Sequence, residues 1–168
     1  MANGDSEVSR LVDQLEREHV GEPWHGPPLV RILAGIGHQQ AAVRPLAGAH
    51  TIWELVLHIT AWKNEVRRRL NGAPAGDPSE GDWPEPPSSP TADAWRQALD
   101  ALEEAHRALV DTITRLPDQQ LFEPTNDPRV DENGSADTCF QLVQGVIQHD
   151  AYHSGQIALL KKAVVRSP

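Results

Sequence analysis

Apolar side chains recur at steps of three and four residues along most of this chain, which is the spacing of one face of an α-helix. No stretch shows the strict alternation of apolar and polar residues that predicts a β-strand. Thr51 and Glu54 have the spacing of a capping box at a helix start, and Asn71 with Gly72 is a stop signal. The pattern predicts an all-α protein with long helices over about 51–70, from Thr91 to Pro117 and from about Asp137 to Val164.

The amino-terminal part predicts two helical pieces rather than one continuous helix. Their apolar residues are Val8, Leu11, Val12 and Leu15 in the first piece and Leu29, Ile32, Leu33 and Ile36 in the second. Three prolines and two glycines lie between them, within residues 21–28. Because proline lacks a backbone donor and clashes with the preceding turn, we expect an irregular, ordered segment here. Trp24 and His25 lie in this segment and are expected to line a pocket.

The connection over residues 71–90 contains six prolines and three glycines, too many for regular secondary structure. Extended at about 3.3 Å per residue it reaches over about 60 Å, twice the length of a 20-residue helix. It can therefore act as a crossover between the second and third helices, which are then parallel. Trp83, within it, is expected to be exposed. A second connection, 117–136, carries Leu121 and Phe122 as an expected anchor onto the core.

Length and charge narrow the function classes. A chain of 168 residues predicts one domain, spanning 1–168. Fifteen basic against 24 acidic residues give a net charge of −9, which argues against nucleic-acid binding. No stretch approaches the roughly 20 apolar residues of a membrane span, and MANGDSEVSR lacks the features of a secretory signal, so we expect a cytoplasmic protein. The single cysteine, Cys139, excludes an internal disulfide and a cysteine-rich metal site.

Three of the eight histidines are expected to face the interior together. His149 and His153 are four residues apart, so they project from one helix face and can share a metal ion. His58 lies three residues after Leu55 and four before Trp62, on the inner face of its own helix. Together they predict a three-nitrogen site with open coordination positions. The alternative is three core histidines that are only hydrogen-bonded.

The other histidines are given simpler roles. His106 has the same inward periodicity as His58, but a position at the core edge or on the surface is the favoured interpretation. Three further histidines lie at segment ends and are expected to be solvated: His19, His38 and His50.

Two further residues are candidates for catalysis. HDAYH, at 149–153, is similar to the metalloprotease pattern HExxH, so Asp150 is a candidate base or orienting group, although a solvated helix carboxylate is the favoured alternative. A protease is not expected, because no strand is available to align a substrate. Cys139 lies near the amino end of the last helix, where the helix dipole can lower a thiol pKa, but the sequence places no histidine beside it.

Two segments of this chain resemble the signature segments of the DinB/YfiT-like superfamily. They are HTIWELVLHITAW at 50–62 and QHDAYHSGQIALLKK at 148–162, and EPWHGPPLVRILAGI at 22–36 is similar to the entry segment of one branch. The resemblance implies a four-helix bundle with a crossover connection, frequent homodimerisation and a divalent metal on three histidines. Matched residue by residue, those ligands are His58, His149 and His153.

The expected activity follows from a metal on three neutral imidazoles. The ion keeps its double charge, lowers the pKa of bound water or thiol and polarises a bound oxygen. The resembled superfamily includes thiol-dependent transferases that use bacillithiol or mycothiol and proteins assigned as metal hydrolases. We therefore expect a metal-dependent enzyme on small molecules, with thiol S-transfer preferred over hydrolysis. Nickel, zinc, iron and manganese all accept imidazoles. The alternative is a non-catalytic metal- or ligand-binding bundle, or a dimeric interaction module.

Three aromatic residues complete the expected site. Trp24 and Trp62 are candidates for the wall of the substrate pocket, and His25 is a candidate acid or base. The alternatives are that Trp62 packs in the core and that Trp24 and His25 anchor their loop.

Overall fold

The computed structural model describes residues 6–129 and 136–165. Within these ranges there are six α-helices, one 3-10 helix and no β-strand, so the predicted all-α class is confirmed. In chain order the elements are α1 (Glu7–His19), α2 (Leu29–Leu33), α3 (His38–Ala42), α4 (Ile52–Leu70), α5 (Ala92–Thr114), the 3-10 helix η1 (Asp118–Phe122) and α6 (Cys139–Val165). No helix in the described part of the chain is long and apolar enough to cross a membrane.

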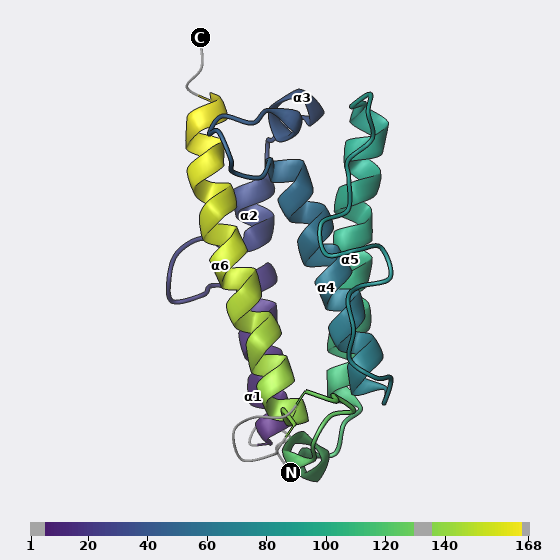
Figure 1. Cartoon of the computed structure of the whole chain (residues 1–168). Helices are drawn as coiled ribbons and strands as arrows, with labels where there is room; N and C mark the ends of the chain where they lie inside the picture. Colours follow the sequence, from purple (N-terminus) through teal and green to yellow (C-terminus); the bar gives the residue numbers. More distant parts are fainter. Residues whose placement is uncertain (1–5, 130–135, 166–168) are drawn as a thin grey trace.

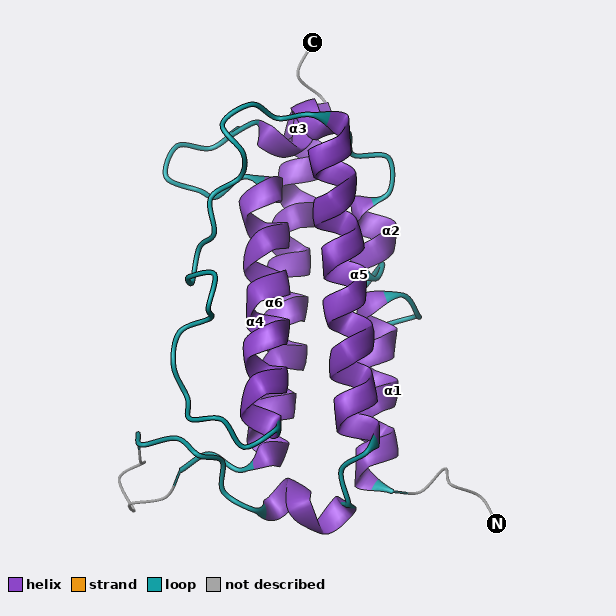
Figure 2. Cartoon of the chain, turned by 90° about the vertical axis from the view of Figure 1, so that its right-hand side faces the viewer, coloured by secondary structure: helices purple, strands orange, loops and turns teal. Residues whose placement is uncertain are grey.

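The longer helices lie side by side along one axis (Figure 1). Helix α4 packs against α5 and α6, and α1 packs against the same two helices. Helix α2 packs on α6 beyond the end of α1, and α3 packs on the start of α4. Helices α4 and α5 run in the same direction, and the segment 71–91 between them returns along the outside of the molecule (Figure 2). Histidines on α4 and on α6 can therefore meet in the space between these helices.

The interior contains two clusters of buried apolar side chains, which we call the upper and lower clusters after their places in Figure 1. The upper cluster includes Ile52, Trp53, Leu55, Ile59, Trp95, Leu102, Ile157 and Leu160. The lower cluster includes Leu11, Leu15, Val66, Leu70, Leu109, Ile113, Val143 and Val146. On α4, α5 and α6 respectively, the buried polar residues Lys63, His106 and Asp150 lie between the two clusters. A polar layer thus divides the core.

The structure differs from expectation in its connections and its short helices. Leu121 is fully buried in the lower cluster, whereas Phe122 is exposed, so only the first of the two anchors η1 to the core. Phe122 instead stacks on Phe140 near the start of α6. The piece expected around Leu29 to Ile36 is a short helix that ends at Leu33. Neither α3 nor η1 was expected, because the apolar residues of HQQAA and DQQLF are adjacent and do not repeat at a helical spacing.

The start of α4 is fixed by the expected capping box. The Thr51 hydroxyl accepts a hydrogen bond from the Glu54 amide at 3.1 Å, and a carboxylate oxygen of Glu54 accepts one from the Thr51 amide at 2.7 Å. Both bonds satisfy amides that the first turn of a helix leaves without partners.

We predict that Thr51→Ala lowers the free energy of unfolding by about 1 kcal/mol, because the alanine cannot cap α4. Thr51→Ser keeps the hydroxyl and should stay closer to the parent. Urea unfolding followed by circular dichroism measures both variants. Equal stability of the alanine and serine variants would contradict the capping role.

Candidate metal centre

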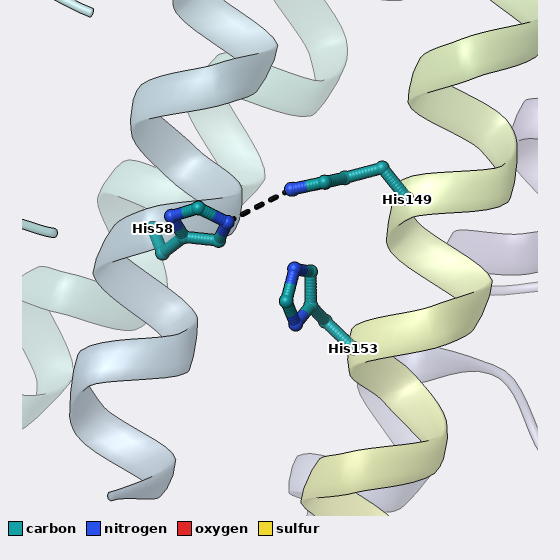
Figure 3. Close-up of side chains that lie close together, drawn as sticks. All are labelled: His58, His149 and His153. Atoms are coloured by element: carbon teal, nitrogen blue, oxygen red, sulfur yellow. Dashed lines mark hydrogen bonds between the residues drawn. The ribbon is translucent and has the colours of Figure 1, made fainter. Parts of the chain in front are cut away.

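Three histidines from two helices converge in the space between α4 and α6. His58 comes from α4, and His149 and His153 from successive turns of α6 (Figure 3). The Nε2 atoms of His58 and His149 are 2.9 Å apart, and the ring centroids of the three residues are separated by 4.4–4.8 Å. One nitrogen from each ring lies within 4.8 Å of the others. The structure brings together the three residues expected to form the site.

The outer nitrogens of two of these rings are held by acceptors. The Nδ1 atom of His58 is 2.5 Å from the backbone oxygen of Asp82, and the Nδ1 atom of His153 is 2.8 Å from Oε1 of Gln156. Because carbonyl oxygens only accept, both Nδ1 atoms carry the proton. The Nε2 atom of each ring therefore keeps a lone pair, which is the form that binds a metal ion.

Burial also favours the neutral form of these rings. Desolvation lowers the pKa of His58, and the neighbouring His149 lowers it further, while the bond to Asp82 raises it. Desolvation lowers the pKa of His153 to about 4, against the bond to Gln156. Both imidazoles are therefore neutral at pH 7, so no proton must leave them when a cation binds.

The contact between His58 and His149 tests whether this donor set fits a metal ion. Since Nε2 of His58 holds a lone pair, the facing Nε2 of His149 must either carry a proton or share a cation with it. Two imidazoles bound to one ion, each at about 2.1 Å, have nitrogens about 3 Å apart at an octahedral right angle and about 3.4 Å apart at a tetrahedral angle. The observed 2.9 Å is close to the first of these separations. This pair, with a nitrogen of His153 within 4.8 Å of both, is compatible with one divalent ion.

The segment 71–91 between α4 and α5 contributes two residues, Asp82 and Trp83, that the sequence analysis did not place at this site. Trp83 stacks between His50 and His58, with centroid distances of 3.5 and 3.8 Å and nearly parallel rings. The Asp82 carboxylate also accepts a hydrogen bond from Nε1 of Trp62 at 2.8 Å. The expectation of an exposed Trp83 is wrong, because two imidazole faces cover its ring. The segment therefore fixes the orientation of His58 from outside the helices.

The polar layer in the core lies directly beside this cluster. Asp150 is 1 % exposed and forms an ion pair with Lys63, which is 0 % exposed. Nζ of Lys63 is also 3.5 Å from Nδ1 of His106, whose ring stacks on His19 with a centroid distance of 3.7 Å. Burial and the charge of Lys63 lower the pKa of His106 to about 2 and also lower the pKa of His19.

Three expectations about this layer are therefore wrong. Asp150 is not a solvated carboxylate, because it is compensated in the interior by Lys63. His19 is not solvated, and His106 is neither at the core edge nor on the surface, because each is 2 % exposed and covers the other. The apolar period places His106 on an inner face but gives no sign of the residues that cover these three side chains, since their partners come from other helices.

The remaining candidates lie in different surroundings. Trp62 is half-buried and, with His149, lines a pocket of about 250 Å³ between α4 and α6. Trp24 is fully exposed and His25 pairs with Glu18 of α1, so the structure does not bring these two to the three histidines. Cys139 is buried, and burial raises the pKa of its thiol, contrary to the lowering expected from the helix dipole.

We predict that Trp83→Ala weakens zinc binding about two- to tenfold, because an aromatic pair contributes about 0.5–1.5 kcal/mol and holds His58 in place. Trp83→Phe keeps a stacked ring and should bind nearly as well as the parent. Trp24→Ala, which removes an exposed tryptophan, is the control. Calorimetric zinc titration compares the variants, and equal affinity for all of them would show that the stack plays no part.

Comparison with known proteins places this arrangement in a family. Residues 9–157 match the family model described as the DinB superfamily. No curated protein matches the chain. The match covers all of α4 and the part of α6 up to Ile157, and so includes all three histidines, in agreement with the resemblance seen at 50–62 and in most of 148–162. The chain belongs to the DinB superfamily.

Proposed function

We propose that this chain is a divalent-metal-dependent enzyme that acts on small molecules, built on the four-helix bundle with a crossover connection implied by its family resemblance. The observation that carries the proposal is the group of three imidazole nitrogens within 4.8 Å, contributed by His58, His149 and His153. Two of these rings are neutral and have their outer nitrogens occupied. This donor set suits zinc, nickel, iron or manganese.

The chemistry would be that of a Lewis acid. A divalent ion on three neutral imidazoles supplies two positive charges, which lower the pKa of bound water or thiol. Within this class we favour S-transfer from a low-molecular-weight thiol of the bacillithiol or mycothiol type to an electrophilic small molecule, with hydrolysis as the alternative. The family resemblance supports that preference. His58, His149 and His153 bind the ion, while Trp83 covers one face of the His58 ring.

The pocket beside His149 is a suitable place for the substrate. Its volume is about 250 Å³, and it is lined mainly by apolar side chains, with three polar residues, Asp137, Gln141 and His149. The lining residues are Trp62, Val66, Asp137, Gln141, Leu142, Gly145, Val146 and His149. A glycine within a helix costs about 1 kcal/mol relative to alanine. A Cβ at Gly145 would meet no atom within 4 Å, so packing does not require a glycine there, and its absent side chain leaves the pocket open.

The metal site is tested by the metal content of untagged protein. After reconstitution with nickel, zinc, iron or manganese, plasma mass spectrometry should find close to one ion per chain. His58→Ala and His153→Ala should each lose it, because two imidazoles bind more weakly than three. His38→Ala, outside the cluster, should retain it. A parent chain without metal would leave the histidines as core residues of a non-catalytic interaction bundle.

We predict that Gly145→Leu lowers turnover by the metal-loaded protein at least tenfold, because the new side chain fills the pocket beside His149. The matched control is Gly155→Leu, on the same helix, where a Cβ also meets no atom within 4 Å and no pocket residue is changed. The assay follows consumption of a low-molecular-weight thiol with small aromatic electrophiles, and ester hydrolysis in parallel. Equal loss in both variants would mean that the pocket does not hold the substrate.

A further inference from the structure

His149 differs from His58 and His153 in the surroundings of its outer nitrogen, Nδ1. His58 and His153 each place Nδ1 within hydrogen-bonding distance of an oxygen. The Nδ1 atom of His149 is buried without a hydrogen-bond partner, and so is Oδ1 of Asp150. These two atoms lie 3.8 Å apart. A shift of about 1 Å brings them to hydrogen-bonding distance, which gives all three rings an outer acceptor.

The other oxygen of the same carboxylate is held from a different helix. Oδ2 of Asp150 pairs with Nζ of Lys63 from α4, and neither side chain is more than 1 % exposed. Burial alone raises the pKa of Asp150, but the charge of Lys63 and contacts with Lys63 and His149 outweigh it and keep the pKa low. A buried ion pair seldom stabilises a fold more than apolar residues of the same size. Its position beside a ligand residue therefore points to a role in the site.

We propose that Lys63 and Asp150 are positioning residues for His149, an inference that rests on the proposed metal site. Lys63 holds Oδ2 of Asp150, and Oδ1 accepts a hydrogen bond from Nδ1–H of His149. The Nε2 lone pair of His149 then faces the lone pair of His58 at 2.9 Å. Two lone pairs at that distance repel unless a cation lies between them. The buried pair thus selects the tautomer of His149 that binds metal and disfavours the competing one.

The first test is the affinity of the 168-residue chain for zinc, measured by competition with a chromophoric chelator. Lys63→Met and Asp150→Asn should each weaken binding about ten- to hundredfold, the usual effect of losing an outer partner of a ligand histidine. Lys161→Met is the matched control: its ammonium donates to the backbone oxygens of Ile32 and Ala34 at 2.8 and 2.7 Å. That variant should lose stability while keeping the parent affinity.

The second test separates positioning from general destabilisation. Long-range proton–nitrogen correlation spectra of the zinc-loaded protein report which nitrogen of each histidine carries the proton. In Asp150→Asn, the Nδ1–H signature of His149 should change, whereas those of His58 and His153 should stay, because their acceptors are intact. This substitution preserves volume, so it carries the test if Lys63→Met does not fold.

The outcomes distinguish the two proposals. A parent chain that binds zinc, with variants of Lys63 and Asp150 that fold and bind it equally well, would overturn the positioning role and leave the metal site standing. Unchanged His149 signals in Asp150→Asn would do the same. A parent chain that binds no zinc, nickel or manganese would overturn the proposed function and this inference with it.

Discussion

A lysine ammonium with no exposed surface, held against a buried carboxylate, is the constraint around which this molecule is organised. Charges of this kind are tolerated in an interior only when each is compensated at close range. Lys63 and Asp150 meet this condition across α4 and α6, and they lie between the two apolar clusters. The histidines use the same interhelical space. The packing of α4 on α6 is therefore set by polar partners as well as by apolar area.

The external segment 71–91 is the second determinant of the site. Because α4 and α5 run in parallel, the chain must return over the full length of the helices (Figure 2). Asp82 and Trp83, partway along it, contact His58 through a backbone oxygen and a stacked ring. The connection required by topology thus also supplies part of the environment of a ligand. Its prolines limit the conformations of the free chain, which reduces the entropy lost when it packs.

Much of the fold follows from local patterns. The long helices are readable because their apolar faces repeat at a helical period, and the start of α4 because its capping residues lie three apart. His149 and His153 are readable because both lie on one helix, and His58 because it shares the inner face with Leu55. The positions of Asp150, His106 and Trp83 are not. Their partners lie 25 to 90 residues away, so only tertiary packing decides them.

The division of the core into two clusters also affects which substitutions the protein can accept during evolution. The apolar wall of the pocket beside His149 belongs to the lower cluster. Val66 and Val146 are members of that cluster, and Leu142 packs against it. The upper cluster, which holds α2 and α3 against α4, α5 and α6, contributes nothing to that wall. Substitutions in widely separated groups of residues tend to be energetically independent. Substitutions during evolution can therefore change the shape of the pocket without altering the upper cluster. The contribution of that cluster to the free energy of unfolding is then retained.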